Sequence, residues 1–351
     1  MLPSLKSVSR LVIRCPNWVG DIVMATPVFR CVRDNFPDTE IAALIRPYAR
    51  GIIEGGPWFD AVIDCDDKGV SGTLRTRSSL RAFGADAALL LPNTTHSFIT
   101  CKLAGIPRIY GYRRNLRSAW LTAGPTPGRE GKGFKPVPMQ DYYLELCRFL
   151  GLTVSGSPHV ELTIPDEVAA KGARRLRDYG VTEQDFVIGL NPGASFGSSK
   201  CWPPEYFAVL AGLLQKYLSC KLLLLAGPGE EKIADAIVAQ SDAVIINTAG
   251  DKIDLAELKP LVKRCDLLIT NDTGPRHYAV AFGVPNIVLM GPTNPVYTAR
   301  NMEHTLVLRR DLECSPCHKK VCPYRHHACM TEITPELVMQ RTLDMLNQPA
   351  S

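Results

Sequence analysis

The sequence predicts an α/β protein with two doubly wound domains, each built on a parallel sheet covered by helices. Its 351 residues correspond to about two domains at roughly 150 residues each. Apolar residues make up 46% of the chain and charged residues 21%, as in an ordinary soluble globular protein. The strand-like runs are almost wholly apolar rather than alternating, which indicates strands buried on both faces, as in parallel sheets.

Short apolar runs, turns rich in Gly, Pro and Asn, and amphipathic stretches follow one another along the chain. The predicted strands are 11–14, 41–45, 61–64, 87–91 and 108–110 in the first half, and 186–190, 221–225, 243–246, 266–270 and 286–290 in the second. Helical stretches between them include 205–217 and 255–264. This alternation is typical of parallel sheets with helices on both sides.

A linker is expected near the middle of the chain. The turn-rich segment Ser155–Pro158 opens it, and a charged, helix-forming stretch continues it to about residue 185. We therefore expect a first domain over 1–165 and a second over 180–333. A last helix over 334–348, with Thr334 as N-cap and Pro335 in its first turn, is a candidate to pack back onto the first domain.

Charge and hydropathy argue against several classes of protein. A formal charge of +5 is too small, on a chain of this length, to suggest nucleic-acid binding. The longest apolar run, near Leu222–Leu225, falls far short of the roughly 20 residues that cross a bilayer. Basic residues such as Arg10 and Arg14 interrupt any apolar region at the N-terminus, so no signal peptide is evident. We expect a cytoplasmic protein.

Two such domains would bind a ligand in the cleft between the carboxyl ends of their sheets. The loop after the first strand brings Asp21 to the start of the next helix. Asp21 is there either a helix-capping residue or a general base at the mouth of the cleft. The loop holds no second acidic residue, which argues against a pair of glycosidase carboxylates unless another loop supplies one.

The loop Asn191–Lys200, after the first strand of the second half, suits a phosphate or diphosphate. Gly193 and Gly197 allow backbone amides to approach a ligand, Ser195 offers a hydroxyl, and Lys200 brings a positive charge just before a helix. The loop lacks the Gly-Lys-Ser/Thr of a Walker motif, so we do not expect nucleoside triphosphate hydrolysis. An ordinary Gly/Ser-rich turn with a surface lysine is the alternative.

The same loop also matches the G-x-S-x-G motif of serine hydrolases, and Asp272 and His277 follow in the order of their catalytic triad. We disfavour this interpretation. In those enzymes a helix begins directly after the serine, whereas Pro203 and Pro204 delay it here. Asp272 and His277 also share one short loop, while a triad takes its acid and its histidine from separate loops.

Two further loops carry polar residues at strand ends of the second half. After Gly227-Pro-Gly229, Glu230 or Glu231 is placed either to bind ribose hydroxyls or to favour the first turn of a helix. The other loop has more polar groups than a connecting loop needs: Asp272, Thr273 and the free amides around Gly274. His277, one turn into the following helix, faces either the cleft or the core.

Two clusters lie outside these loops. Four arginines fall within ten positions, at Arg108, Arg113, Arg114 and Arg117. Such a cluster either forms a solvated surface or binds an anionic ligand. Near the C-terminus, Cys314, Cys317, Cys322 and Cys329 are interleaved with His318, His326 and His327, a set that could bind a structural zinc ion. Disulfides and unpaired structural thiols are the alternatives. Because this cluster follows the second sheet, we expect any metal there to lie apart from the ligand-binding loops.

Taken together, the loops resemble glycosyltransferase family 9, the ADP-heptose:lipopolysaccharide heptosyltransferases, and are most similar to its heptosyltransferase II branch. The resemblance covers nearly the whole chain. It rests, in this order and spacing, on Pro16-Asn-Trp-Val-Gly-Asp21 with Ala25-Thr-Pro27, Leu89-Leu-Leu-Pro-Asn93, Asn191-Pro-Gly-Ala194 through Lys200-Cys-Trp-Pro203, Asn271-Asp-Thr-Gly-x-x-His277, and Gly291-Pro-Thr293. It implies the GT-B fold, in which two Rossmann-like domains face each other across a cleft.

The resemblance also implies the reaction and the roles of residues. An inverting glycosyltransferase would move a heptose from ADP-heptose to the first heptose of the anionic lipopolysaccharide inner core. The chemistry would require no cofactor. The resemblance leaves undecided whether the protein contacts the surface of the inner membrane. Asp21 corresponds to the catalytic base and Lys200 to the donor-phosphate lysine. The other donor-binding residues in the second domain would be Gly193, Ser195, Glu230 or Glu231, Asp272, Thr273, Gly274 and His277. The acceptor-binding residues in the first domain would be Asn93, Arg113, Arg114 and Arg117.

Two features depart from the family pattern. Arg276 is long and charged where relatives often carry a small or apolar residue, and the cysteine cluster is absent from some members. The alternatives are transfer with another nucleotide sugar or acceptor, and a non-catalytic nucleotide-sugar-binding protein, which would bind ADP without turnover.

Overall fold

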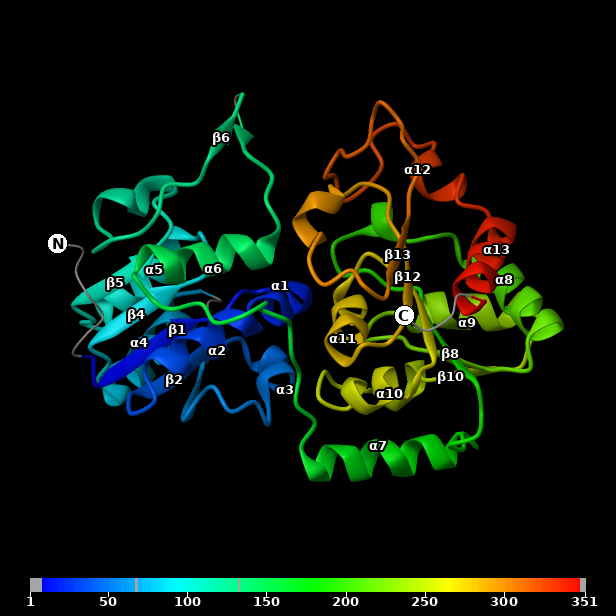
Figure 1. Ribbon diagram of the computed structural model, residues 1–351, viewed down its shortest axis with the longest axis horizontal. Helices are drawn as coiled ribbons and strands as arrows, with labels where there is room; N and C mark the ends of the chain where they lie inside the picture. Colours follow the sequence, from blue (N-terminus) through cyan, green and yellow to red (C-terminus); the bar gives the residue numbers. More distant parts are fainter. Residues whose placement is uncertain (1–7, 67–68, 132, 348–351) are drawn as a thin grey trace. The chain divides into compact units, whose positions relative to one another are not determined.

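The computed structural model describes residues 8–66, 69–131 and 133–347, and the chain divides into two compact units (Figure 1). The first unit runs to Thr163 and includes Val296–Arg300, and the second comprises Ile164–Pro295 and the chain from Asn301 onward. Residues 1–7 of the expected first domain and residue 348 of the expected last helix lie outside the described residues.

The first unit is built on a five-stranded parallel sheet in the order β3-β2-β1-β4-β5. Its strands are β1 (Arg10–Arg14), β2 (Glu40–Ile45), β3 (Ala61–Asp64), β4 (Ala87–Leu90) and β5 (Arg108–Gly111), each within one residue of its predicted bounds. The chain adds β2 and β3 on one side of β1, and β4 and β5 on the other. The loops after β1 and β4 therefore flank the point where the strand order reverses, which is where open α/β sheets bind ligands.

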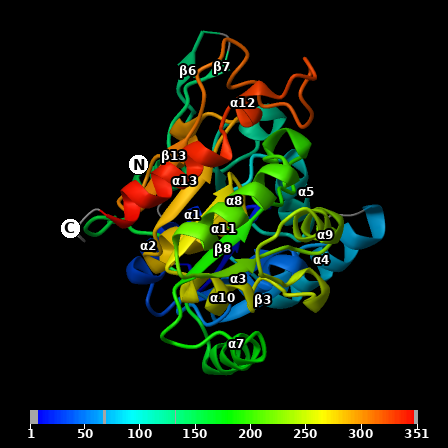
Figure 2. The same cartoon turned by 90° about the vertical axis from the view of Figure 1, so that its right-hand side faces the viewer.

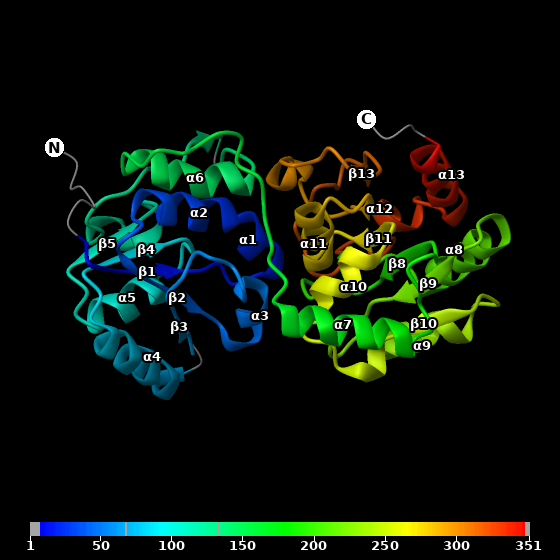
Figure 3. The same ribbon diagram turned by 60° about the horizontal axis from the view of Figure 1, so that its bottom comes forward.

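Helices cover both faces of this sheet. On one side α2 (Thr26–Asn35) packs against α6 (Met139–Phe149), and on the other α4 (Gly69–Phe83) packs against α5 (Thr95–Leu103) (Figure 3). The shorter segments are α1 (Val19–Met24), α3 (Arg50–Ile53), the 3-10 turns η1 (Pro47–Ala49) and η2 (Asn115–Ala119), and the hairpin of β6 (Arg129–Glu130) and β7 (Gly133–Phe134).

The second unit contains a six-stranded parallel sheet in the order β10-β9-β8-β11-β12-β13. Its strands are β8 (Val187–Asn191), β9 (Lys221–Leu224), β10 (Ile245–Asn247), β11 (Leu267–Asn271), β12 (Asn286–Leu289) and β13 (Thr305–Leu308). The sequence did not predict β13, which pairs in parallel with β12, and the expectation that the sheet ends at β12 is wrong. The strand order reverses between β8 and β11, as it does between β1 and β4.

Helices also cover both faces of the second sheet. One group is α8 (Pro204–Tyr217), α9 (Glu231–Ala239) and α13 (Pro335–Leu346), and the other is α7 (Asp166–Asp178), α10 (Leu258–Arg264) and α11 (Gly274–Phe282) (Figure 2). The short α12 (Ala328–Thr331) and the 3-10 turns η3 (Ser198–Lys200), η4 (Ala249–Asp251) and η5 (Pro295–Thr298) complete the described elements. None of the described helices has both the length and the hydropathy needed to cross a membrane.

The last helix differs from its expected placement. Thr334 caps α13 as predicted, since its side chain accepts a hydrogen bond from the Leu337 N–H at 3.3 Å. The helix packs on α8, and Val338 and Met339 lie in the core of the second unit. The expectation that it packs back onto the first domain is therefore wrong, because its apolar face is used within the second unit.

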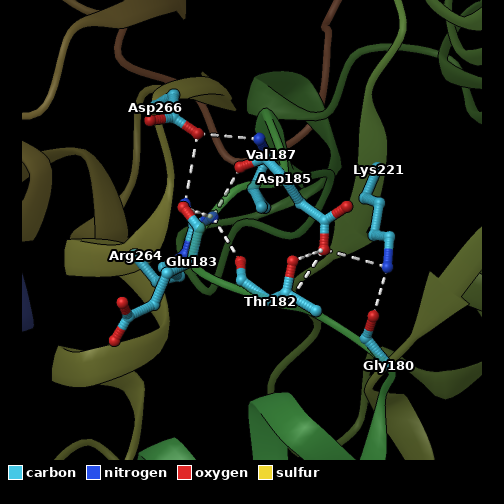
Figure 4. A network of polar contacts seen from close by, with 8 residues as sticks. All are labelled: Gly180, Thr182, Glu183, Asp185, Val187, Lys221, Arg264 and Asp266. Atoms are coloured by element: carbon cyan, nitrogen blue, oxygen red, sulfur yellow. Dashed lines mark hydrogen bonds and ion pairs between the residues drawn. The ribbon is translucent and has the colours of Figure 1, made fainter.

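A polar network fixes the start of the second sheet (Figure 4). The Arg264 guanidinium donates to the carbonyls of Thr182 at 2.8 Å and of Asp185 at 2.5 Å. The Asp185 carboxylate in turn accepts hydrogen bonds from the N–H and the hydroxyl of Thr182. Asp266, just before β11, accepts the N–H of Val187, the first residue of β8, at 2.8 Å. These contacts fix the position of the first residue of β8, and therefore the position at which the strand ends and the following loop begins.

Candidate active site

The carboxyl ends of β8 and β11 are tied together by asparagine side chains. Asn191 donates to the Leu225 carbonyl at 2.8 Å, and Asn271 donates to the Pro192 carbonyl at 2.6 Å. The Asn271 side chain also accepts the N–H of Trp202 at 3.1 Å. Trp202 is fully buried, so these contacts fix both ends of the loop that carries Lys200.

Lys200 belongs to a compact ionic cluster centred on Asp272. Its ammonium donates to Asp272 Oδ2 at 2.8 Å and to the Asp272 carbonyl at 2.9 Å. Arg276 Nη1 donates to Asp272 Oδ1 at 2.8 Å, and the Thr293 hydroxyl donates to Asp272 Oδ2 at 2.6 Å. The side chains of Lys200, Asp272 and Arg276 are 14%, 8% and 1% exposed. The structure thus brings the predicted Lys200 and Asp272 into direct contact.

The cluster carries an excess of positive charge. Burial alone would raise the pKa of Asp272, but the charges of Arg276 and Lys200 and the hydrogen bonds from Lys200 and Thr293 hold this pKa well below its ordinary value. Asp272 is therefore ionised, and two cations face one anion. An ammonium has three N–H donors, of which Lys200 gives two to Asp272, so one is left for an anionic ligand.

The N-terminus of α11 lies beside this cluster. The helix begins at Gly274, after Thr273 in an extended conformation and with Pro275 in the first turn. The first amides of a helix have no partner within it and carry a partial positive charge, which favours an anion. His277 is buried rather than open to a ligand. Burial, followed by the charges of Arg276 and Lys200, lowers its pKa to about 3 despite the opposing effect of Asp272, so it is neutral at pH 7.

The structure distinguishes the two glutamates at the start of α9. The Glu230 carboxylate accepts the N–H of Gly227 at 2.8 Å and lies directly over Gly193, where any β-carbon would overlap its oxygens. Burial, with a smaller contribution from Glu231, raises the pKa of Glu230, although the Gly227 N–H opposes this. Glu231 instead accepts the N–H of Gly229 and is exposed. Glu230 is therefore the one of the pair that lies against the Gly193–Lys200 loop.

The cysteine-rich segment 313–331 supports this loop from outside. The Ser199 N–H donates to the Lys320 carbonyl at 3.1 Å, and the Ser199 hydroxyl donates to the Lys319 carbonyl. His327 Nε2 lies 2.9 Å from the Ser199 carbonyl, to which it must donate because a carbonyl oxygen can only accept. A β-carbon on Gly197 would overlap the Lys320 carbonyl, which explains the glycine there. The segment that carries the cysteines thus contacts the Gly193–Lys200 loop directly, while the position of any metal relative to the ligand-binding loops stays a prediction.

The same segment also contacts the loop after β12. The His318 N–H donates to the Pro292 carbonyl at 2.8 Å, and the Ser315 hydroxyl donates to the Gly291 carbonyl at 2.7 Å. This loop carries Thr293, which holds Asp272. All four cysteines of the segment are free thiols, and within the described ranges there is no group of three or more His, Cys, Asp or Glu side chains that could hold a metal ion.

In the first unit, Asp21 lies in the first turn of α1 and is half-buried. Burial, followed by the charge of Asp21, raises the pKa of Tyr143 on α6, which places the carboxylate near that ring. The preceding loop is held by the buried Arg14, which donates to Asn17 Oδ1 at 2.6 Å, and by Tyr48, which donates to the Asn17 carbonyl. The loop that carries Asp21 is thus anchored at Asn17 by these two side chains.

The turn after β4 is organised by Arg117. Its guanidinium is fully buried and donates to the Pro92 carbonyl at 2.7 Å and to Asn93 Oδ1 at 3.0 Å. Tyr142 donates to the same Asn93 oxygen at 3.1 Å, and its ring stacks on Tyr112 with centroids 3.8 Å apart. Burial, followed by the charge of Arg114, lowers the pKa of Arg117 to about 10, although Tyr142 opposes this shift.

This geometry separates the arginines that the sequence grouped. Arg117 was expected at an anionic acceptor together with Arg113 and Arg114, but its side chain is used inside the fold to hold the Asn93 turn. Arg113 is exposed, and the Arg114 guanidinium lies over the Phe134 ring, 3.8 Å from its centroid. Arg113 and Arg114 thus keep a placement from which they could meet a ligand.

The hydrolase alternative does not fit the structure. Ser195 is exposed in a loop, and the next α-helix begins only at Pro204, so the serine is not on a strand-to-helix elbow. Asp272 is already bound by Lys200, Arg276 and Thr293, and is thus not available to orient a histidine.

Several contributors to the site were missed from the sequence. Arg276 stands four residues after Asp272, a helical spacing that indicates an ion pair and could have been used. Thr293 enters the sequence analysis only as the end of the Gly291-Pro-Thr293 motif, and its contact with Asp272 joins two separate loops. The contact between His327 and Ser199 joins segments far apart in the chain, so no local pattern indicates it.

Known proteins that are similar to this chain bear on its family and its fold. The model of glycosyltransferase family 9 (heptosyltransferase) matches residues 73–328. The chain is 25% identical over 342 residues to lipooligosaccharide heptosyltransferase 2 of Campylobacter jejuni, covering 96% of this chain and 98% of that protein. It is 25% identical over 354 residues to lipopolysaccharide heptosyltransferase 2 of Escherichia coli K12, covering 97% and 99%.

Solved structures give the same result. A family 9 glycosyltransferase from Veillonella parvula is similar with a TM-score of 0.84 at 26% identity, covering 96% of this chain and 97% of that one. The E. coli ADP-heptose lipopolysaccharide heptosyltransferase II has a TM-score of 0.78 at 23% identity, covering 96% and 98%. The predicted GT-B class, with two Rossmann-like parallel-sheet domains, is confirmed, while their facing across a cleft stays a prediction.

Proposed function

Because the chain belongs to glycosyltransferase family 9, we propose that it transfers a heptose from ADP-heptose to the first heptose of the lipopolysaccharide inner core, with inversion. The observation that carries this proposal is the Lys200–Asp272–Arg276 cluster, whose excess positive charge lies at the start of α11. The names of the C. jejuni and E. coli relatives support the choice of sugar and of acceptor class.

The second unit is proposed to bind the donor. Lys200 and the first amides of α11 would contact the diphosphate, together with Gly193 and Ser195 in the loop and Thr273 and Gly274 at the helix start. Asp272 has both carboxylate oxygens engaged, so we assign it to positioning Lys200 rather than to direct contact with the sugar. His277 supports the same turn from the core, as a neutral side chain.

Glu230 is proposed as the ribose-binding carboxylate. It is half-buried over Gly193, at the edge of the loop assigned to the diphosphate, whereas Glu231 turns toward Gly229. A carboxylate oxygen that accepts one backbone N–H retains further lone pairs, which can accept the hydroxyls of a ribose.

The first unit is proposed to bind the acceptor and to supply the base. Asp21 is held in the first turn of α1 by a loop that Arg14 and Tyr48 anchor. Arg113 and Arg114 would meet the anionic groups of the inner core. Asn93 would contribute through its turn, which Arg117 holds as a positioning residue.

The chemical step follows from these roles. Asp21 takes the proton of the acceptor hydroxyl while the oxygen of that hydroxyl forms a bond to the anomeric carbon of the heptose. On the opposite face, the bond from the anomeric carbon to the diphosphate oxygen breaks, and its electron pair leaves with ADP. Lys200 and the α11 amides stabilise the negative charge that develops on ADP. Attack from the opposite face inverts the configuration.

The decisive experiment offers ADP-heptose and a truncated, delipidated inner-core acceptor and measures ADP release together with the mass of the product. We expect ADP and a product heavier by one heptose in equal amounts. A protein that binds ADP but releases none from the donor would instead be a non-catalytic binding protein. Release with another nucleotide sugar, but not with ADP-heptose, would move the assignment to a different donor.

We also propose that the protein acts at the inner face of the inner membrane, where a lipid-linked acceptor would be met. The support is the nature of that acceptor and the surface of the first unit described below.

A structural zinc ion at Cys314, Cys317, Cys322 and Cys329 is a separate proposal. Its support is the close spacing of the four cysteines along the chain, together with Cys314 Sγ lying 4.0 Å from His326 Nε2 in the same segment. Binding would have to draw them into a tetrahedral set. Metal analysis of the purified protein should find zinc that a Cys314→Ser, Cys317→Ser variant lacks, and protein without zinc would contradict the proposal.

A further inference from the structure

The charges of the first unit are strongly uneven along the chain. Between Gly69 and Gly128 there are eight Lys and Arg residues and one acidic residue, Asp86. The whole chain has 40 basic and 35 acidic residues, so the rest of it has 32 and 34 and is slightly negative. The Asp86 carboxylate accepts the N–H groups of Ser9 and Arg10, both at 2.9 Å, and is thus used at the start of the central strand β1.

The same stretch exposes large apolar side chains on its three helical elements, α4, α5 and η2. Leu116 and Trp120, in and just after η2, are 81% and 63% exposed, and Leu103 at the end of α5 is 51% exposed. We use the name docking surface for these apolar side chains and the basic residues between them; the apolar ones are Val70, Leu74, Ile99, Leu103, Leu116 and Trp120. Side chains of this size and exposure are not explained by the core of the unit.

The three elements form one continuous surface. α4 packs on α5, and α5 packs on η2; Figures 2 and 3 show α4 and α5 side by side on one face of the sheet. Arg77 Nε donates to the Leu103 carbonyl at 2.9 Å, which joins the side of α4 to the end of α5. The Trp120 ring stacks on Phe98 of α5, with centroids 6.2 Å apart.

The spacing puts the relevant side chains on the outer sides of these helices. On α4, Val70, Leu74 and Arg81 recur at helical intervals, whereas the buried positions of that helix fall on another side. On α5, Ile99, Lys102 and Leu103 are the exposed group. Apolar and cationic side chains thus alternate over one surface. Asp66, just before α4, is paired with Arg75 and adds no free negative charge there.

We propose that this docking surface binds the first unit to an anionic phospholipid bilayer. Exposed Leu, Ile and Trp side chains enter the interface between headgroups and acyl chains, while Lys and Arg side chains pair with lipid phosphates. The stretch from Gly69 to Gly128 has eight basic residues and one acidic residue, and this positive charge is complementary to a negatively charged membrane. Arg113, assigned above to the acceptor, lies at the edge of η2, so a lipid-linked acceptor would reach the first unit there; this last point rests on the proposed function.

Vesicle co-sedimentation of the full chain tests this proposal. We expect binding to vesicles of phosphatidylethanolamine with phosphatidylglycerol, weakened by salt, and little binding to vesicles of phosphatidylcholine alone. The double variant Arg81→Glu, Lys102→Glu should lose roughly tenfold or more of the affinity for anionic vesicles. Leu103→Ser with Leu116→Ser should lose affinity as well, with less effect on its salt dependence. The matched controls, in the second unit, are Lys216→Glu with Lys232→Glu and Val209→Ser with Val244→Ser.

Two readouts separate this proposal from the proposed function. Transfer of heptose to the delipidated acceptor should be unchanged in the docking-surface variants, which also shows that they fold. Equal binding of wild type and variants to anionic vesicles, no binding by the wild type, or equal binding to neutral vesicles would each overturn the docking surface. Vesicle binding that depends on these residues, in a protein without transferase activity, would overturn the proposed function and leave the docking surface standing.

Discussion

The loops after β1 and β8 occupy equivalent places in two sheets of the same strand order, yet they are built differently. After β1 only four residues precede α1, and Asp21 lies within the first turn of that helix. After β8 the chain makes a longer excursion through η3 before α8 begins at Pro204. Lys200, at the end of η3, is held by Asp272 from the neighbouring strand end.

The two constructions suit the two charges to different chemical roles. A carboxylate in a short, anchored turn can accept a proton with little movement of its surroundings. A lysine that must stabilise the charge of a leaving group needs fixed counter-groups, because a preorganised cation costs no rearrangement when the charge develops. The longer loop makes room for those counter-groups and for the cysteine-rich segment behind it.

The largest expected effect comes from the short loop. Asp21→Asn keeps the shape of the side chain but removes the base, so the turnover number should fall by about 10²–10⁴-fold. Its affinity for ADP should be unchanged, since the proposed donor site lies in the other unit. Steady-state rates and calorimetry with ADP measure the two quantities, with the exposed Asp38→Asn as control. Loss of ADP affinity in Asp21→Asn would place this carboxylate in the donor site instead.

A substitution of Lys200 in the longer loop should lower both the affinity for the donor and the turnover number. Lys200→Met removes the charge and retains most of the side-chain length, so donor affinity and turnover should fall together, with kcat/KM lower by roughly 10²-fold. Lys216→Met, on the exposed side of α8, is the matched control. Unchanged kinetics in Lys200→Met would remove this lysine from the site and reduce the comparison to a difference in loop length.

Features of the fold and of the site that depend on neighbouring residues in the chain could be predicted from the sequence. Features that depend on contacts between distant segments could not. Strands such as β1 and β8 are buried on both faces, and their apolar runs indicate them directly. β13 was missed because η5 is the described helical turn between β12 and β13, so the strand–helix alternation gives no signal there. The local sequence shows the arginine cluster, but the inward turn of Arg117 depends on carbonyls at Pro92 and Tyr112, which only the folded chain brings near it.

A smaller effect should come from the charge balance around Lys200. Arg276→Met leaves Asp272 with Lys200 as its remaining cation, so the free energy of unfolding should fall by about 3 kcal/mol. ADP affinity should also fall, because the charge of Lys200 is then offset by Asp272. Denaturant unfolding and ADP calorimetry test this, with the exposed Arg174→Met as control. A stable Arg276→Met variant with full ADP affinity would show that Arg276 does not set the charge of the cluster.

The smallest expected effect lies farthest from the ligand, at the support behind the long loop. His327 donates to the Ser199 carbonyl and has a backbone φ of 51°, which asparagine tolerates better than alanine does. In His327→Asn the shorter side chain cannot reach Ser199, and the lost hydrogen bond of about 1 kcal/mol should raise the KM for the donor roughly fivefold. The turnover number should change little, since Lys200 still reaches its place once the donor is bound.

His327→Gln, whose amide can reach farther, should recover part of the donor KM, and the exposed His304→Asn should behave as wild type. A general loss of folding would lower the amount of active enzyme without changing the donor KM, so the KM separates support of the loop from mere stability. If His327→Asn keeps the donor KM of the wild type, the segment 313–331 only covers the loop. The contrast between a short loop anchored by two side chains, Arg14 and Tyr48, and a long one that needs the support of a whole segment would then fail.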